Sequence, residues 1–368
     1  MAKIKSSPTR NLLFLALIIF SLIYYFQGKG LDINPFSSEE KKIEQEVEIK
    51  VEAKPIMEAS QASTFEKLNI YVDVLNRQSR RIIDSYARYL SWCNKETGPT
   101  GQERHKYGLY SLYDHTKVGS DFEKAQAISP AMPDIEGKAL LFLAALNAVH
   151  EKVGEAYDYY DQEDYKDDGL AKGKEMHVPL IASFEAFMAI DAEMRKAVGM
   201  QVEKVMAQTH LNAEQENDKI LLWTIRSLNE AQKVVEMGNL EDIMTLNVEE
   251  YTHQLDTYNQ VVDSMEYYLE NWQDPDPGVS RIKSMIGGHK NLLKSGKELM
   301  RRVRDKDEFT QTEKRISGRN GGWMVSGSAA KLISDYNNIL GNYNHIRYKT
   351  ELPKLLEVSL SFPNGPTL

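Results

Sequence analysis

The chain has 368 residues, of which 42% are hydrophobic and 27% are charged, and its formal net charge is -9 at pH 7. This composition is typical of a globular protein with one large or two ordinary domains, and the negative charge argues against a nucleic-acid-binding surface. The single cysteine excludes an internal disulfide framework, so packing alone has to stabilise the fold.

An apolar run near the N-terminus extends from Leu12 to Phe26 and is interrupted only by a serine. Basic residues precede the run and an acidic stretch follows it, which places residues 1–10 in the cytoplasm and predicts that the remaining chain is exported. The length of the run fits either a cleaved signal peptide or a transmembrane helix. We expect residues 11–27 to be a retained transmembrane signal-anchor, because the only small-residue pair for a signal peptidase is Gly28 and Gly30. The sequence thus predicts a single-pass protein of the bacterial inner membrane with a periplasmic C-terminal domain.

Residues 28–63 are rich in Glu, Lys and Ser and are interrupted by Pro55, which predicts an extended, charged spacer. A capping box, in which Ser63 is followed by Glu66, predicts the start of the first helix, which continues to about residue 94. Cys93 lies on the apolar stripe of this helix and is expected to be buried.

Apolar residues recur at helical spacing through the rest of the chain, and no stretch after the spacer has sustained strand alternation. The predicted helices cover approximately Asp134–Tyr157, Pro179–Thr209, Ala213–Met237, Leu240–Trp272, Val279–Asp307 and Ser328–Lys349. The sequence therefore predicts an all-α domain over residues 64–350, an elongated array of about seven long antiparallel helices with a candidate sub-division near residue 212 into two sub-bundles. Residues 351–368 are expected to form a C-terminal tail.

The densest polar and aromatic cluster lies in residues 156–168. Its candidate partner- or ligand-binding residues are Tyr157, Asp158, Tyr160, Asp161, Asp164, Tyr165 and Asp168. We interpret the segment as a solvated helix end whose tyrosines pack on a neighbour and face a partner. Two alternatives stay open: an envelope hydrolase that uses paired carboxylates of this segment, and a cation sensor. A calcium loop starting at Asp164 would place Lys166 and Lys172 at ligand positions, which opposes the sensor interpretation.

The other motifs in the sequence are incomplete matches to known catalytic or ligand-binding motifs. The S-x-x-K patterns Ser280–Lys283 and Ser328–Lys331 lack the further elements of the penicillin-binding class. The glycine pairs at 287–288 and 321–322 do not complete a phosphate loop, and the histidines are not paired at metal-ligand spacing. The sequence therefore predicts no catalytic residues, no metal site and no cofactor.

Several longer stretches carry a family resemblance: Leu68–Arg77 running to Ser85–Trp92, Gly98-Pro-Thr-Gly101, Tyr157–Asp161, Tyr165–Asp168, Lys172-Gly-Lys174 and Met176-His177. With these motifs the chain resembles the YiiG-like lipoproteins of proteobacteria, a domain-of-unknown-function family, over about residues 65–350. The resemblance implies an exported helical domain with no assigned chemistry. The chain departs from the lipoproteins because no cysteine follows the apolar run, so a transmembrane anchor would replace the lipid.

These observations together predict a membrane-tethered, extracytoplasmic, helical binding or scaffold protein of the bacterial envelope. Its expected partners are envelope or membrane proteins, reached from the inner membrane through the N-terminal helix, and no nucleic acid. The sequence leaves the oligomeric state open.

We predict that the mature protein keeps its N-terminus, because the apolar run at residues 12–26 lacks a convincing cleavage site. The protein should stay in the membrane fraction through a carbonate wash, and its intact mass after detergent extraction should correspond to the uncleaved chain. A mature chain that begins at Leu31 would show that the run is a cleaved signal peptide.

Overall fold

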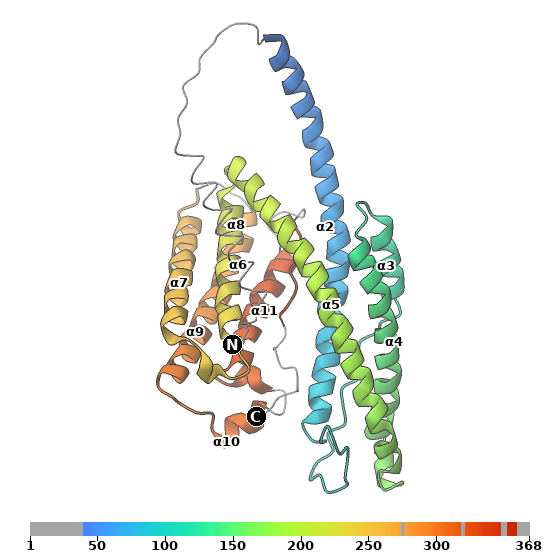
Figure 1. The fold of residues 1–368 in the computed structure, drawn as a ribbon. Helices are drawn as coiled ribbons and strands as arrows, with labels where there is room; N and C mark the ends of the chain where they lie inside the picture. The colour runs from blue at the N-terminus through green and yellow to red at the C-terminus, as the bar shows by residue number, and fades with distance from the viewer. Residues whose placement is uncertain (1–39, 274–276, 318–320, 347–351, 359–368) are drawn as a thin grey trace, which may run out of the picture. The chain divides into compact units, whose positions relative to one another are not determined.

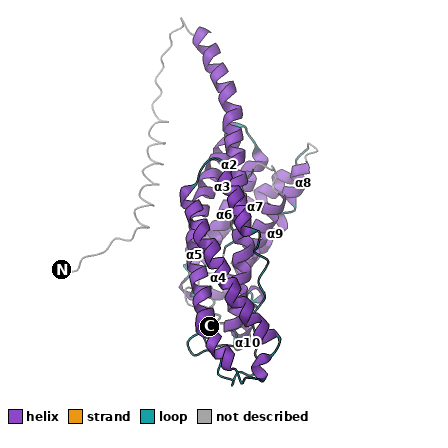
Figure 2. Ribbon diagram, turned by 90° about the vertical axis from the view of Figure 1, so that its right-hand side faces the viewer, coloured by secondary structure: helices purple, strands orange, loops and turns teal. Residues whose placement is uncertain are grey.

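The computed structural model describes residues 40–273, 277–317, 321–346 and 352–358. These residues form helices and loops without a β-strand, as Figure 2 shows, which confirms the predicted all-α class. The chain divides into a unit of residues Met1–Met57 and a unit of residues Glu58–Leu368. The predicted anchor at 11–27 lies outside the described residues. Within them, no helix is both long enough and apolar enough to span a membrane.

The elements are named in chain order in Figure 1. They are α2 (Glu40–Leu90), α3 (Val118–Ala127), α4 (Pro133–Asp161), the 3-10 turn η1 (Asp164–Lys166), α5 (Ala171–Gln215), α6 (Lys219–Gly238), η2 (Ile243–Thr245), α7 (Val248–Glu270), α8 (Pro277–Lys283), α9 (Ile286–Arg304), α10 (Gln311–Ile316), η4 (Gly322–Met324) and α11 (Ala329–Ile346).

The structure corrects the predicted spacer and the first helix start. Helix α2 begins at Glu40, so residues 40–63 are helical and the capping-box pattern at Ser63 lies inside the helix. Glu, Lys and Ala make up most of this stretch and have high helix propensity, and the helix continues through Pro55 although proline in a helix interior costs about 3 kcal/mol. The remaining spacer residues, 28–39, lie outside the described residues.

Other helix boundaries also differ from the prediction. Helix α5 begins at Ala171, and Pro179, the predicted first residue, lies within it. The predicted helix over 279–307 is broken into α8 and α9, and the short helices α3 and α10 lie where the sequence pattern predicted none. Two of these starts have local caps that the periodicity does not reveal: Asp168 at the start of α5 and the Thr310–Glu313 capping box at the start of α10.

A first core cluster draws residues from α2, α3, α4 and α5. A chain of aromatic contacts crosses these helices: Tyr71 lies 5.5 Å from Phe122, Phe122 lies 6.1 Å from Phe142, and Phe142 lies 5.2 Å from Phe187 between ring centroids. Helices α4 and α5 pack side by side along their lengths and run antiparallel, since a short connection at 162–170 joins them (Figure 1).

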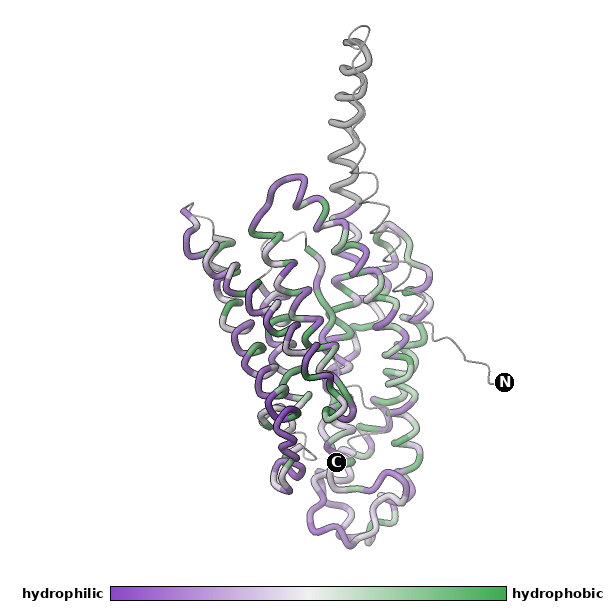
Figure 3. The backbone as a smooth tube through the Cα atoms, turned by 60° about the vertical axis from the view of Figure 1, so that its left-hand side comes forward, coloured by the Kyte–Doolittle hydropathy of each residue, from purple (hydrophilic) through white to green (hydrophobic). Residues whose placement is uncertain are grey.

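A second core cluster is a four-helix bundle of α6, α7, α9 and α11. Helix α6 packs on α7, α7 on α9, α9 on α11 and α11 on α6, which closes the bundle. Its largest fully buried side chains include Tyr251, Tyr258 and Tyr343. Hydrophobic and hydrophilic residues are interspersed along the coloured helices in Figure 3, as expected for helices that bury one face.

Met206 and Leu355 are half-buried and pack against both clusters. Both clusters belong to the unit that begins at Glu58. The sub-division near residue 212 stays a prediction.

A buried lysine fixes the connection between α3 and α4. The Lys67 ammonium has no exposed surface and donates hydrogen bonds to the carbonyl oxygens of Ile128 and Pro130, at 3.0 and 2.9 Å. It also donates to Glu136 Oε1 at 2.5 Å, and this hydrogen bond lowers the pKa of the Glu136 carboxyl. The loop at 128–130 and the first turn of α4 are thereby held on α2.

We predict that Lys67→Met lowers the free energy of unfolding by about 3 kcal/mol, because it leaves Glu136 and two carbonyl groups without their common donor. Urea unfolding of the detergent-solubilised full chain, followed by circular dichroism, measures the change. The matched control is Lys124→Met, whose side chain is 70% exposed and should cost less than about 0.5 kcal/mol. Equal effects of the two substitutions would contradict the prediction.

Candidate functional site

The tyrosine-rich segment predicted from the sequence forms the end of α4, the η1 turn and the entry to α5. Its acidic and aromatic residues are separated in the structure: Asp158, Asp161 and Asp164 are exposed, whereas Tyr157 and Tyr165 are half-buried against the first core cluster. The three carboxylates therefore face solvent and the tyrosines face the protein interior.

Tyr160 belongs to an aromatic cluster of the core. Its ring lies 5.1 Å from that of Trp92, 5.0 Å from that of Tyr159 and 6.2 Å from those of Tyr89 and Tyr165. Tyr160 is only 6% exposed, and burial raises the pKa of its hydroxyl well above the ordinary value. This residue is therefore a packing residue and is not available on the surface for a partner.

Asp168 organises the start of α5. Its carboxylate accepts hydrogen bonds from the main-chain N–H groups of Lys172 and Leu170, at 2.9 and 2.8 Å, and from the Tyr159 hydroxyl at 2.8 Å. These hydrogen bonds, that of Lys172 above all, lower the pKa of Asp168. A carboxylate in this position satisfies amides that the first turn of a helix leaves without partners. Asp168 therefore caps α5, whose first residue, Ala171, lies eight residues before the predicted start at Pro179.

The lysines in the calcium-like pattern are engaged elsewhere. Lys166 pairs with Glu163, and the Lys172 ammonium lies 3.6 Å from Glu155. Among the described residues, no group of three or more His, Cys, Asp or Glu side chains is placed to hold a metal ion. The second S-x-x-K pattern is a helix start, in which Ser328 accepts from the Lys331 main-chain N–H and Lys331 pairs with Asp335.

A buried histidine joins α5 to the end of α2. His177 Nε2 lies 2.8 Å from the carbonyl oxygen of Lys95 and therefore carries the proton, so Nδ1 accepts from the Tyr89 hydroxyl at 3.0 Å. Cys93 is buried as predicted, with its sulfur 3.8 Å from Nδ1, and burial raises its pKa to about 11. The thiol thus stays protonated and is not an activated nucleophile.

A second buried histidine lies in the four-helix bundle. His289 has no exposed surface; its Nδ1 lies 2.6 Å from the Tyr258 hydroxyl and its Nε2 lies 3.4 Å from the Ser227 hydroxyl. Ser227 donates its own proton to the Thr224 carbonyl oxygen, so its oxygen accepts from Nε2. Burial lowers the pKa of His289 to about 4. The residue is therefore a neutral connector inside the core, and its isolated position in the sequence gave no sign of these partners.

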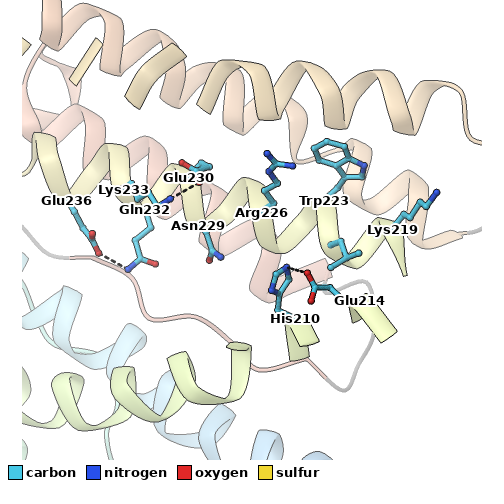
Figure 4. A pocket seen from close by; sticks show the side chains of 11 residues that line it. His210, Glu214, Lys219, Trp223, Arg226, Asn229, Glu230, Gln232, Lys233 and Glu236 are labelled. Carbon is cyan, nitrogen blue, oxygen red and sulfur yellow. Dashed lines mark hydrogen bonds and ion pairs between the residues drawn. The ribbon is translucent and has the colours of Figure 1, made fainter. Parts of the chain in front are cut away.

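An open cavity of about 730 Å³ lies along α6 and the end of α5 (Figure 4). The tight turn between these helices brings them together: Asn217 adopts a left-handed backbone conformation at φ 54°, and Asp218 accepts from the Leu221 main-chain N–H at 3.0 Å. The lining residues are His210, Glu214, Lys219, Leu222, Trp223, Arg226, Asn229, Glu230, Gln232, Lys233 and Glu236.

Both signs of charge lie on the wall of this cavity. Lys233 donates to Glu230 at 2.7 Å, and Gln254 of α7 also donates to Glu230 at 2.8 Å. Burial opposes the charge of Glu230, but these hydrogen bonds outweigh it and lower the pKa of the carboxyl. The Arg226 guanidinium lies 5.6 Å from the ring centroid of Trp223. Trp and Arg are enriched at protein interfaces and supply much of their binding energy.

This cavity was not predicted from the sequence. In the sequence, the feature that could have indicated the cavity is the group of charged residues around Trp223 on the amphipathic helix α6. The wall also needs His210 and Glu214 from α5, whose imidazole and carboxylate atoms lie 3.9 Å apart. Their placement beside α6 depends on the turn at 216–218.

Comparison with known proteins places the chain among proteins without an assigned activity. The family model "Protein of unknown function (DUF3829)" matches residues 62–345, which include the buried residues of both core clusters except Leu352. The chain is also similar to "Uncharacterized protein YiiG" of Escherichia coli (strain K12), with 28% identity over 314 residues, 81% of this chain and 85% of that protein. No solved structure matches the chain. The resemblance stated from the sequence motifs is confirmed.

We predict that the free energy of unfolding falls as the pH drops from about 6.5 to 4. His289 has a folded-state pKa of about 4, below its ordinary 6.5, so the unfolded chain binds more protons in this window and gains stability relative to the folded chain. His289 contributes at most about 1.4 kcal/mol per pH unit to the change in the free energy of unfolding.

Urea unfolding at several pH values measures this slope, and His289→Gln should reduce it. Burial also lowers the pKa of His150 to about 4, so part of the slope remains in the variant. His105→Gln, at an exposed position, is the control. An unchanged slope in His289→Gln would contradict the assignment.

Proposed function

The chain belongs to the DUF3829 family of proteins of unknown function, and from that premise we propose that it is a membrane-tethered, extracytoplasmic binding or scaffold protein of the bacterial envelope. The observation that carries the proposal is the open cavity on α6. It exposes both signs of charge around Trp223 and Arg226, a combination suited to a protein segment of complementary charge.

The tether is supported by the N-terminal sequence. The apolar run at residues 12–26 and the basic residues before it favour an inner-membrane helix with a cytoplasmic N-terminus. Such a helix would confine the helical domain to the periplasmic side of the membrane and bring envelope or membrane proteins within its reach. The net charge of -9 disfavours anionic lipid headgroups as the ligand, so a protein partner is the better match.

We predict that a photo-cross-linking side chain at Asn229, an exposed residue of the cavity wall, forms a discrete covalent adduct with an envelope protein in intact cells. Trp223→Ala should strongly reduce this adduct, because the ring supplies apolar contact area on the cavity wall. Gel electrophoresis and mass spectrometry of the cross-linked band measure the result.

The matched control places the cross-linker at Ala192, an exposed position of α5 outside the cavity. The same band from Ala192, or an adduct from Asn229 that survives Trp223→Ala, would count against the cavity as the docking surface.

A further inference from the structure

Residues 352–358 follow α11 and pack against both core clusters without forming a helix or a strand. Two asparagines of α11 pair with their main chain. Asn344 accepts from the Leu355 N–H at 2.7 Å and donates to the Leu355 carbonyl oxygen at 2.8 Å. Asn337 accepts from the Val358 N–H at 2.8 Å and donates to the Val358 carbonyl oxygen at 2.7 Å. Each side-chain amide thus bonds both polar main-chain groups of one residue.

Two asparagines of α2 hold the same segment from the other side. Asn69 accepts from the Lys354 N–H at 2.6 Å. Asn76 accepts from the Glu357 N–H at 3.0 Å and donates to the Leu355 carbonyl oxygen at 3.1 Å. We call the four residues Asn69, Asn76, Asn337 and Asn344 the asparagine clamp. All four are half-buried.

The spacing of the clamp matches an extended chain. Each helix presents asparagines seven residues apart, and seven residues of α-helix rise ~10.5 Å. The asparagines of α2 accept from the N–H groups of residues 354 and 357, and those of α11 accept from the N–H groups of residues 355 and 358. In each pair the bonded residues are three apart, and three extended residues span ~10 Å. Heptad spacing on a helix is therefore in register with every third residue of an extended peptide.

Side chains of the segment add a smaller set of contacts. Lys354 pairs with Asp73, and the Glu357 carboxylate lies 3.5 Å from Arg80. Leu352 is buried in the second cluster, and Leu355 packs on both clusters. A peptide that binds this site therefore needs free main-chain N–H groups three residues apart. It also needs apolar residues at the positions of Leu352 and Leu355 and a basic residue at the position of Lys354.

We propose that the asparagine clamp is a binding site for an extended peptide segment of a partner protein, and that residues 352–358 occupy it as an internal competitor. A primary amide offers the donor and the acceptor of a peptide group, so the clamp can recognise the main chain of a peptide independently of its side chains. Within the described chain no element follows residue 358, so release of the segment detaches no helix from its bundle. The clamp shares no residue with the α6 cavity, and its test does not depend on that cavity.

The test uses the full detergent-solubilised chain and a fluorescent peptide with the sequence of residues 352–358. A variant with Leu355→Pro and Val358→Pro loses two N–H donors of the internal segment and leaves the clamp intact. The variant should bind the peptide about tenfold or more tighter than the wild-type chain, whose internal segment competes at high effective concentration. Adding Asn76→Ala and Asn344→Ala should abolish the gain, and a peptide carrying the same two prolines should not bind.

Hydrogen exchange of the wild-type chain gives a second measurement that needs no variant. The N–H groups of Lys354, Leu355, Glu357 and Val358 should exchange slowly, and excess peptide should accelerate their exchange in proportion to its concentration. If the proline variant does not fold, this measurement decides alone. Unchanged protection at saturating peptide, or a folded proline variant that binds no peptide, would show that the segment is a permanent structural strap and overturn the proposal.

Discussion

One guanidinium group joins the parts of the helical unit that the sequence keeps far apart. Arg195 of α5 donates to Asp191 at 2.9 Å, to the Leu75 carbonyl oxygen of α2 at 2.8 Å and to the Glu357 carbonyl oxygen at 3.1 Å. Ser79 of α2 donates to the other oxygen of Asp191 at 2.5 Å. Asp191 is only 5% exposed, so its charge depends on these donors. Because the planar fork of arginine can bond several acceptors in fixed directions, the contact holds α2 and α5 in one arrangement and adds one hydrogen bond to residues 352–358.

Buried polar contacts of this kind complement the apolar packing. Each core cluster contains a tyrosine–histidine pair, Tyr89 with His177 in the first and Tyr258 with His289 in the second. Apolar stripes bury a helix face but tolerate rotation and sliding of one helix on another. A buried donor or acceptor that loses its partner costs more than a displaced methyl group, so these pairs favour one register of each helix. In a chain with a single cysteine, specific polar contacts therefore carry part of the role that disulfides have in disulfide-bonded proteins.

The site residues chosen from the sequence and those favoured by the structure lie in different places. The tyrosines of the segment at 157–168 contribute to the core, and Asp168 caps α5. The α6 cavity and the asparagine clamp are both built from side chains of more than one helix. A surface built in this way suits recognition of an extended or charged protein segment, which fits the binding role proposed for this member of the family.

The all-α class, the positions of most long helices and the family could be predicted from the sequence, because helical periodicity and short motifs are local properties of the chain. The sequence also predicted that Cys93 is buried, from the apolar stripe on which this residue lies. The folded structure was needed to show that Asn76 and Asn344 bond the same main chain and that His289 lies against Tyr258. A periodic pattern fixes which face of a helix is buried, but it does not encode the partner, the crossing angle or the axial register. Those are set by packing between residues distant in the sequence, and each proposed site is made of such residues.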